Sequence, residues 1–243
     1  MASAGDVKEA LAAVASADDA AFLQRFFKTG PGQYGAGDVF IGVRVPATRA
    51  VVKRFSGLPL EQIAILLDSE VHEHRLAALI ALNAAFARAS ATRTRDEDER
   101  ERIAEFYLRA VRGGCVNNWD LVDTSAEYIL GEYLYDRPRR LLFDLAARPE
   151  LWQRRVAVLS TFGFIKHGDA STTLELAALL LDDPEDLMHK AVGWMLREIG
   201  KRVDRNLLVG FLDEHAARMP RTMLSYATEH LDAVQRAAYR AAR

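Results

Sequence analysis

Apolar residues recur every three or four positions along most of the chain, which is the period of amphipathic α-helices. Segments with the alternating pattern of a β-strand are hard to find. The best of them, residues 39–43, is short and isolated, so we expect an extended loop segment there. Helices are expected to begin near Asp6, Asp18, Pro46, Pro59, Val71, Asp96, Trp119, Pro138, Glu150, Ala170, Glu185, Asp204, Pro220 and Asp232. About a dozen helices with short connections predict an all-α protein.

Residue types that favour helix ends lie at several of these positions. Prolines suit the first helical turn, and four lie at expected starts: Pro46, Pro59, Pro138 and Pro220. Asp204 is a suitable N-cap, because its carboxylate can accept a bond from a free backbone N–H group. Gly57 and Gly200 are expected to end the helices that precede them.

Composition limits the class of partner. Of the 243 residues, half are hydrophobic, 32 are Lys or Arg and 34 are Asp or Glu, which leaves a formal net charge of −2. Such a chain can bury a substantial core and is not expected to be disordered. A chain-wide basic protein is excluded, so any surface that binds anions must be local.

Cysteine and histidine usage argues against disulfides and metal sites. The single cysteine, Cys115, excludes an internal disulfide and any zinc site built on several cysteines. The six histidines are scattered, and His72 and His74 diverge on a helix, so neither a metal nor another cofactor is expected. The N-terminal stretch lacks signal-peptide features, and no window approaches about 18 consecutive apolar residues. A cytoplasmic protein without membrane contact is therefore expected.

The segment NNWDLVD at 117–123 does not resemble plain core. Either asparagine can cap a helix that begins at Trp119, which places Trp119 and Asp123 one turn apart on one face. A carboxylate held beside an indole ring is unusual in a core. The alternative is that Asp120 and Asp123 only complement the positive end of the helix, which suits Asp120 better.

A second segment, WQRRVAVLS at 152–160, carries two adjacent arginines. Helical spacing groups Trp152 with Arg155, whereas Arg154 points about 100° away. Lys166 follows eleven residues after Arg155. The alternative is a surface arginine whose aliphatic stem packs on Trp152.

A third segment, at 188–201, has two stripes at helical spacing. The apolar stripe is expected to face the core and contains Met188, Ala191, Val192, Met195 and Ile199. The other stripe is basic with a tryptophan in its middle and contains Lys190, Trp194, Arg197 and Lys201. An aromatic ring among cations suits an anionic partner with planar or sugar-like groups. An ordinary amphipathic helix explains the cations but explains the tryptophan poorly.

The spacing between these segments distinguishes a compact helical bundle from a solenoid of helix pairs. Asp123 and Arg155 are 32 residues apart, and Arg155 and Trp194 are 39 apart, close to one helix-pair repeat each. Equivalent positions of successive repeats line the same surface of a solenoid. The spacing therefore favours a solenoid with the three segments side by side on its concave face.

Several segments together resemble the HEAT-repeat DNA alkylation repair family, the AlkD-like glycosylases. They are CVNNWDLVD (115–123), WQRRVAVLS (152–160), HKAVGWMLRE (189–198) and PRTMLSYATEHL (220–231). The stretch YGAGDVFIGVRVPATRAVVK at 34–53 is also similar to that family. The resemblance runs in order over most of the chain. It implies a single domain over residues 1–243, a right-handed solenoid of HEAT-like helix pairs with a concave DNA-binding face.

The resemblance also implies roles for individual residues. The family's catalytic aspartate falls on Asp123, and its tryptophan one turn earlier falls on Trp119. The family's arginine falls on Arg155, with Arg154 as the alternative register, and would bind a DNA phosphate. The expected DNA-binding residues are Trp194, Lys190, Arg197, Lys201 and Lys166.

The activity that the resemblance implies is removal of positively charged N3- or N7-alkylated purines from duplex DNA. This hydrolysis would begin base excision repair and would not require base flipping. Because the Trp119–Asp123 motif holds no lysine, a monofunctional glycosylase is expected. A monomer is the simpler expectation for a protein that wraps DNA. One alternative is a non-catalytic HEAT-repeat protein that binds damaged or branched DNA. A second, which would leave the carboxylate–indole pair unexplained, is a protein–protein scaffold.

Overall fold

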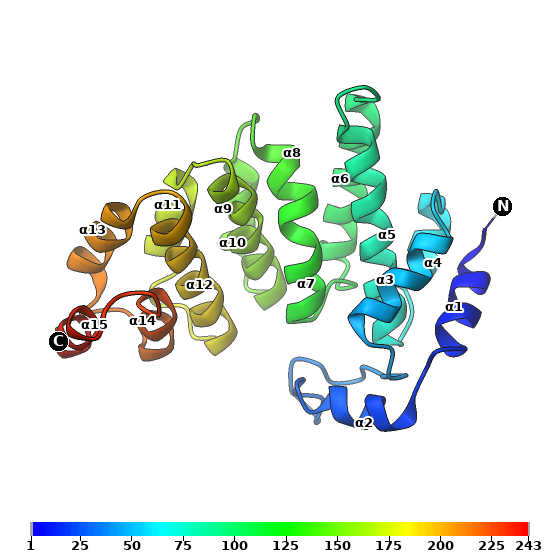
Figure 1. Ribbon diagram of the computed structural model, residues 1–243, viewed down its shortest axis with the longest axis horizontal. Coiled ribbons are helices and arrows are strands. Elements are labelled where there is room, and N and C mark those ends of the chain that lie inside the picture. Colours follow the sequence, from blue (N-terminus) through cyan, green and yellow to red (C-terminus); the bar gives the residue numbers. More distant parts are fainter. Residues whose placement is uncertain (1, 243) are drawn as a thin grey trace. The chain divides into compact units, whose positions relative to one another are not determined.

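The computed structural model describes residues 2–242, and within them the fold is all-α (Figure 1). The helices are α1 (Ala4–Ala12), α2 (Ala17–Gln24), α3 (Val45–Arg54), α4 (Leu60–Leu67), α5 (His72–Ser90), α6 (Glu97–Arg112), α7 (Trp119–Ala126), the π-helical η1 (Glu127–Gly131), α8 (Glu132–Leu134), α9 (Arg140–Ala146), α10 (Leu151–Lys166), α11 (Ser171–Leu179), α12 (Asp186–Arg202), α13 (Arg205–His215), α14 (Arg221–Ala227) and α15 (Ala233–Ala241). Residues 39–43 form a loop, as expected, with one isolated bridge between Val39 and Val71.

The predicted helix starts agree with the observed ones to within two residues. Asp204 caps α13 by accepting a bond from the backbone N–H of Asn206. Of the four prolines, Pro46 lies in the first turn of α3, Pro59 and Pro220 are N-caps, and Pro138 precedes α9 by two residues.

The prediction that Gly200 ends its helix is wrong, because α12 continues to Arg202. The glycine serves a close approach between helices instead. A Cβ atom at Gly200 would lie 2.5 Å from Leu208 Cδ2, so a larger residue would force the Leu208 side chain to shift.

The chain divides into two compact units, Met1–Ser125 and Ala126–Arg243. In the first unit α5 is the central helix and packs against α1, α3, α4 and α6. Its middle is buried on more than one face, since Leu76, Ala77, Leu79 and Leu82 are at most 2% exposed. Its first turn, in contrast, buries the polar side chains of His72 and Glu73.

The second unit is a stack of helix pairs. The long helix α10 packs against η1, α9, α11 and α12, and α12 in turn packs against α13 and α14. At Gly131 the backbones of η1 and α10 come so close that a Cβ atom would lie 2.4 Å from the Ser160 carbonyl oxygen. The apolar stripe predicted on α12 is confirmed, because its five residues are at most 1% exposed.

Candidate functional site

Helix α7 begins at Trp119, as predicted, so Trp119 and Asp123 lie one turn apart. Between them Leu121 and Val122 are fully buried, whereas Trp119 and Asp123 are half-buried. Asn118 accepts a bond from the backbone N–H of Trp119 at 2.9 Å. The indole and the carboxylate therefore share the less buried side of α7.

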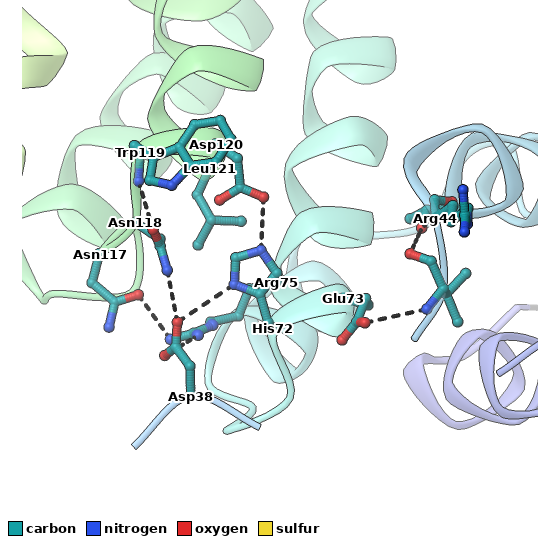
Figure 2. A network of polar contacts seen from close by, with 12 residues as sticks. Asp38, Arg44, His72, Glu73, Arg75, Asn117, Asn118, Trp119, Asp120 and Leu121 are labelled. Carbon is teal, nitrogen blue, oxygen red and sulfur yellow. Dashed lines mark hydrogen bonds and ion pairs between the residues drawn. The ribbon is translucent and has the colours of Figure 1, made fainter. Parts of the chain in front are cut away.

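Asp120, next to this pair, does more than complement the end of the helix. Its carboxylate lies 2.7 Å from Nε2 of His72, the first residue of α5 (Figure 2). The imidazole is buried, and on its other side Nδ1 faces Asp38 at 3.5 Å. His72 thus lies between two carboxylates that come from two different segments of the first unit.

Asp38 connects the network to a second cation and to the helix cap. It accepts bonds from Arg75 at 2.5 Å and from the side-chain amide of Asn118 at 2.9 Å. Arg75 also donates to the side chain of Asn117 at 2.8 Å. The loop between α2 and α3, the start of α5 and the start of α7 are therefore joined through polar and charged side chains, as Figure 2 shows.

The network holds two cations and two carboxylates with little access to water. Burial alone would lower the pKa of His72, but its bonds to Asp120 and Asp38 outweigh that effect and raise it to about 9. Burial raises the pKa of Asp38, but its bonds to His72 and Arg75 leave it below its ordinary value. At neutral pH, His72 is therefore an imidazolium.

Aromatic rings pack between the charged network and Trp119. Phe27 stacks on Trp119 with centroids 5.2 Å apart and an interplanar angle of 17°. The same ring contacts His72 at 5.0 Å and Phe40 at 4.9 Å, and Phe40 stacks on His72 at 4.7 Å. One face of the Trp119 indole is therefore covered by Phe27.

The charge of Asp123 acts on the buried hydroxyl of Tyr107. Burial raises the pKa of the Tyr107 phenol, its bond to Ser125 lowers it, and the charge of Asp123 raises it further. The helix that carries Asp123 continues directly into η1. π-Helical turns of this kind are rare and are frequent at functional sites.

In the second unit Trp194 has a carboxylate of its own. Its Nε1 donates to Glu198 one turn later at 3.3 Å, and its ring packs on Phe162 at 5.7 Å. Glu198 is buried and also accepts bonds from Arg197 at 3.1 Å and Arg202 at 2.6 Å. The tryptophan on the basic stripe therefore belongs to a neutralised polar cluster.

Most of the predicted DNA-binding cations have carboxylate partners within the second unit. Lys166 pairs with Glu127 at 2.9 Å and lies over the Phe162 ring. Lys190 pairs with Asp186 at 2.8 Å, and Arg197 pairs with Glu229 as well as Glu198. Lys201 is exposed. Any DNA phosphate would compete with these internal ion pairs.

The two arginines of α10 differ in what their guanidinium groups bind. All three nitrogens of Arg154 are used by Asp183 and by the carbonyl groups of Arg148 and Pro149. Arg155 is 4% exposed, so it is not a surface arginine, and its Nη1 donates to the Leu187 carbonyl at 2.6 Å. Arg154 is therefore a structural residue that holds the α9–α10 turn against Asp183.

Comparisons with known proteins identify the family. A family model described as DNA alkylation repair enzyme matches residues 7–231. The chain belongs to this family. A solved structure described as a predicted DNA alkylation repair enzyme from Enterococcus faecalis shares the fold, with a TM-score of 0.65 and 15% identity over 90% of this chain and 97% of that chain. No curated protein matches the chain.

Membership of the DNA alkylation repair family gives the protein a role in the repair of alkylated DNA, with DNA as its partner. Within residues 2–242, no helix is long and apolar enough to cross a membrane. In the same range, no group of three or more His, Cys, Asp or Glu side chains could hold a metal ion. In the Asp38–His72–Asp120 cluster, both imidazole nitrogens face carboxylates.

The predicted site residues fall into two groups. Trp119 and Asp123 lie together in the first unit, and Arg155, Trp194 and the four lysine and arginine positions lie in the second. The convergence of both groups on one concave face stays a prediction.

Sequence reasoning missed the residues that surround Trp119. His72 and its partner Asp120 are 48 residues apart, so no short motif joins them. Phe27 and Phe40 lie in or near loops where apolar periodicity is absent. The available signal is the run of polar residues at 72–75, which forms the first turn of α5 and precedes its long apolar stretch.

Proposed function

We propose that this member of the DNA alkylation repair family is a monofunctional DNA glycosylase. Its substrate would be duplex DNA that carries a positively charged N3- or N7-alkylated purine. Water would add to C1′ of the deoxyribose while the C1′–N bond breaks. The products would be the neutral free base, an abasic site and a released proton. The observation that carries the proposal is the Trp119–Asp123 pair on the less buried side of α7.

The chemistry of the lesion suits this pair. An alkylated purine already carries positive charge, so it leaves without a strong general acid. The deoxyribose becomes oxocarbenium-like as the bond breaks, and a fixed carboxylate such as Asp123 stabilises that charge electrostatically. An indole face attracts cations by about 0.5–2 kcal/mol, and we assign this role to Trp119. No step requires the base to enter a deep pocket.

The second unit would contribute contacts to the DNA backbone. We assign this role to Arg155, Trp194, Lys166, Lys190, Arg197 and Lys201. Arg155 is preferred to Arg154 because the family's arginine falls on Arg155, 39 residues before Trp194, whereas Arg154 binds Asp183 and two backbone carbonyl groups. Phosphate contacts would release counterions, so affinity should fall as salt rises.

The test is incubation of the protein with a duplex that holds one N7-methylguanine. Release of free base above the spontaneous rate supports the proposal. Tight, salt-dependent binding without release would identify the alternative, a non-catalytic DNA-binding protein. A covalent complex trapped with borohydride would contradict the monofunctional mechanism, because it requires an amine nucleophile. Binding that is equal at low and high salt would contradict both readings.

A further inference from the structure

We propose that His72 is a positioning residue, which fixes the first turn of α7, and with it the Trp119 ring, against the segment 38–40. The inference rests on the proposed function for its link to base excision. The arrangement of His72 itself is a property of the first unit and can be tested without DNA.

Polar contacts on both sides of the His72 ring hold the backbone at the start of α7. The imidazole binds Asp120 directly, and Asp120 follows Trp119 in the chain. Asp38, on the other side of the ring, binds Asn118, whose side chain caps Trp119. The backbone before and after Trp119 is thus tied to the same pair of residues.

Contacts through the aromatic rings hold the side chain of Trp119. His72 contacts Phe27 and Phe40, and Phe27 stacks on Trp119. The path from His72 through Asp120 to Trp119 therefore returns to His72 through Phe27. A closed ring of contacts restricts both the backbone and the indole, and a change at His72 would loosen both.

His72 lies away from the reacting atoms in this scheme. The groups that face it are Asp38, Asp120 and Arg75, together with the neutral rings of Phe27 and Phe40. The imidazole is 2% exposed and both its nitrogens point to carboxylates. It would act through Asp120 and Phe27 rather than on the substrate.

The experiment compares His72→Gln with His74→Gln. His74 lies on the same helix and binds Ser69, outside the network, so it is a matched control. Glutamine at 72 removes the cation between the two carboxylates. We expect single-turnover excision to fall by ~10- to 100-fold, because small displacements of a catalytic arrangement cost rates of that order. Affinity for the same duplex should stay close to that of the wild type.

A second readout follows Trp119 directly. Trp152 and Trp194 are replaced by Phe, so that Trp119 is the single tryptophan of the variant. In this background His72→Gln should increase collisional quenching of Trp119 and shift its emission to the red, whereas His74→Gln should leave both unchanged. Asp120→Asn should give the same result. The double variant His72→Gln/Asp120→Asn should show no more quenching and no larger red shift of Trp119 than either single variant.

The outcomes separate the two proposals. Unchanged Trp119 emission and quenching in folded His72→Gln protein would overturn the positioning role, whatever happens to excision. A clear change in Trp119 without any base release by the wild type would uphold the positioning role and refute the glycosylase proposal. If His72→Gln does not fold, Asp120→Asn decides by the same two readouts.

Discussion

Each unit contains a tryptophan with a carboxylate four residues later, and the two pairs differ in what surrounds the acid. In the second unit Glu198 is buried, accepts a bond from Trp194 and is neutralised by Arg197 and Arg202. In the first unit Asp123 is half-buried and its charge acts on the Tyr107 hydroxyl, and the charged network lies around its neighbour Asp120. The same spacing therefore produces a structural acid in one unit and a candidate catalytic acid in the other.

The comparison also shows two ways to hold an indole ring. Trp194 is held through its Nε1 atom by Glu198 and by a tilted contact with Phe162. Trp119 is held by a stacked ring, Phe27, and by a helix start tied to His72 and Asp38. The position of the Trp119 ring therefore depends on residues that lie far from it in the sequence.

The largest expected effect comes from removing the charge of Asp123. Asp123→Asn should lower single-turnover excision of N7-methylguanine by ~10²- to 10³-fold, the range for losing one preorganised electrostatic group. Binding of the duplex should persist, because the carboxylate is not needed for phosphate contacts. Asp144→Asn, at an exposed acid of α9, is the matched control. Excision by Asp123→Asn at the wild-type rate would refute the catalytic assignment.

The second-largest effect concerns the pH dependence of stability. Its sign should differ between the network around His72 and the cluster around Glu198. The pKa of His72 in the folded protein is raised to about 9, against about 6.5 in the unfolded chain. Its full contribution to the free energy of unfolding is therefore present below pH 6.5 and is lost as the pH rises through 9. The free energy of unfolding should fall by on the order of 3 kcal/mol across this window.

Urea denaturation at several pH values measures this contribution. His72→Gln should flatten the alkaline decline, and His74→Gln should not. An unchanged decline in His72→Gln would mean that another group carries it. Glu198 should act in the opposite direction: burial raises its pKa, but its bonds to Arg202 and Arg197 leave it lowered, so its contribution is lost on acidification.

These clusters mark the limit of what the sequence could predict. Helix starts near Asp96, Trp119 and Asp204 were predictable because periodicity and capping are local. The Trp119–Asp123 pair was predictable for the same reason, since four residues make one helical turn. The bond between His72 and Asp120 depends on the packing of α5 and α7, which no spacing in the chain encodes.

The burial of Arg155 and the ion pairs of the basic stripe are further features that helical spacing alone does not predict. Helical spacing places Lys190, Trp194 and Arg197 on one stripe of α12, but it does not predict which acids pair with them. The acids that pair with Lys166 and Arg197, Glu127 and Glu229, lie on other segments. Counting cations on one helix therefore overestimates the charge that the surface offers to DNA.

A smaller effect is expected from Glu198→Gln, which tests the structural role of the second pair. The amide can still accept a bond from Trp194, but Arg202 loses its counter-charge and Arg197 keeps only Glu229. We expect a loss of about 1–3 kcal/mol in the free energy of unfolding, towards the low end because Arg202 is 42% exposed and screened by water. Excision should stay within the wild-type range. A large loss of excision in fully folded Glu198→Gln would contradict a purely structural role for Glu198.

The smallest effect is expected from Phe27→Ala, which uncovers one face of Trp119 without changing any charge. Loss of one stacked aromatic pair should cost about 0.5–1.5 kcal/mol of stability beyond the buried area that it removes. The matched change in the second unit is Phe162→Ala, which removes the ring beside Trp194. In the single-tryptophan background, Phe27→Ala should increase quenching of Trp119, and Phe162→Ala should have no effect on it. If Phe27→Ala leaves the quenching unchanged while His72→Gln increases it, the indole is held through the α7 backbone rather than through the stacked ring.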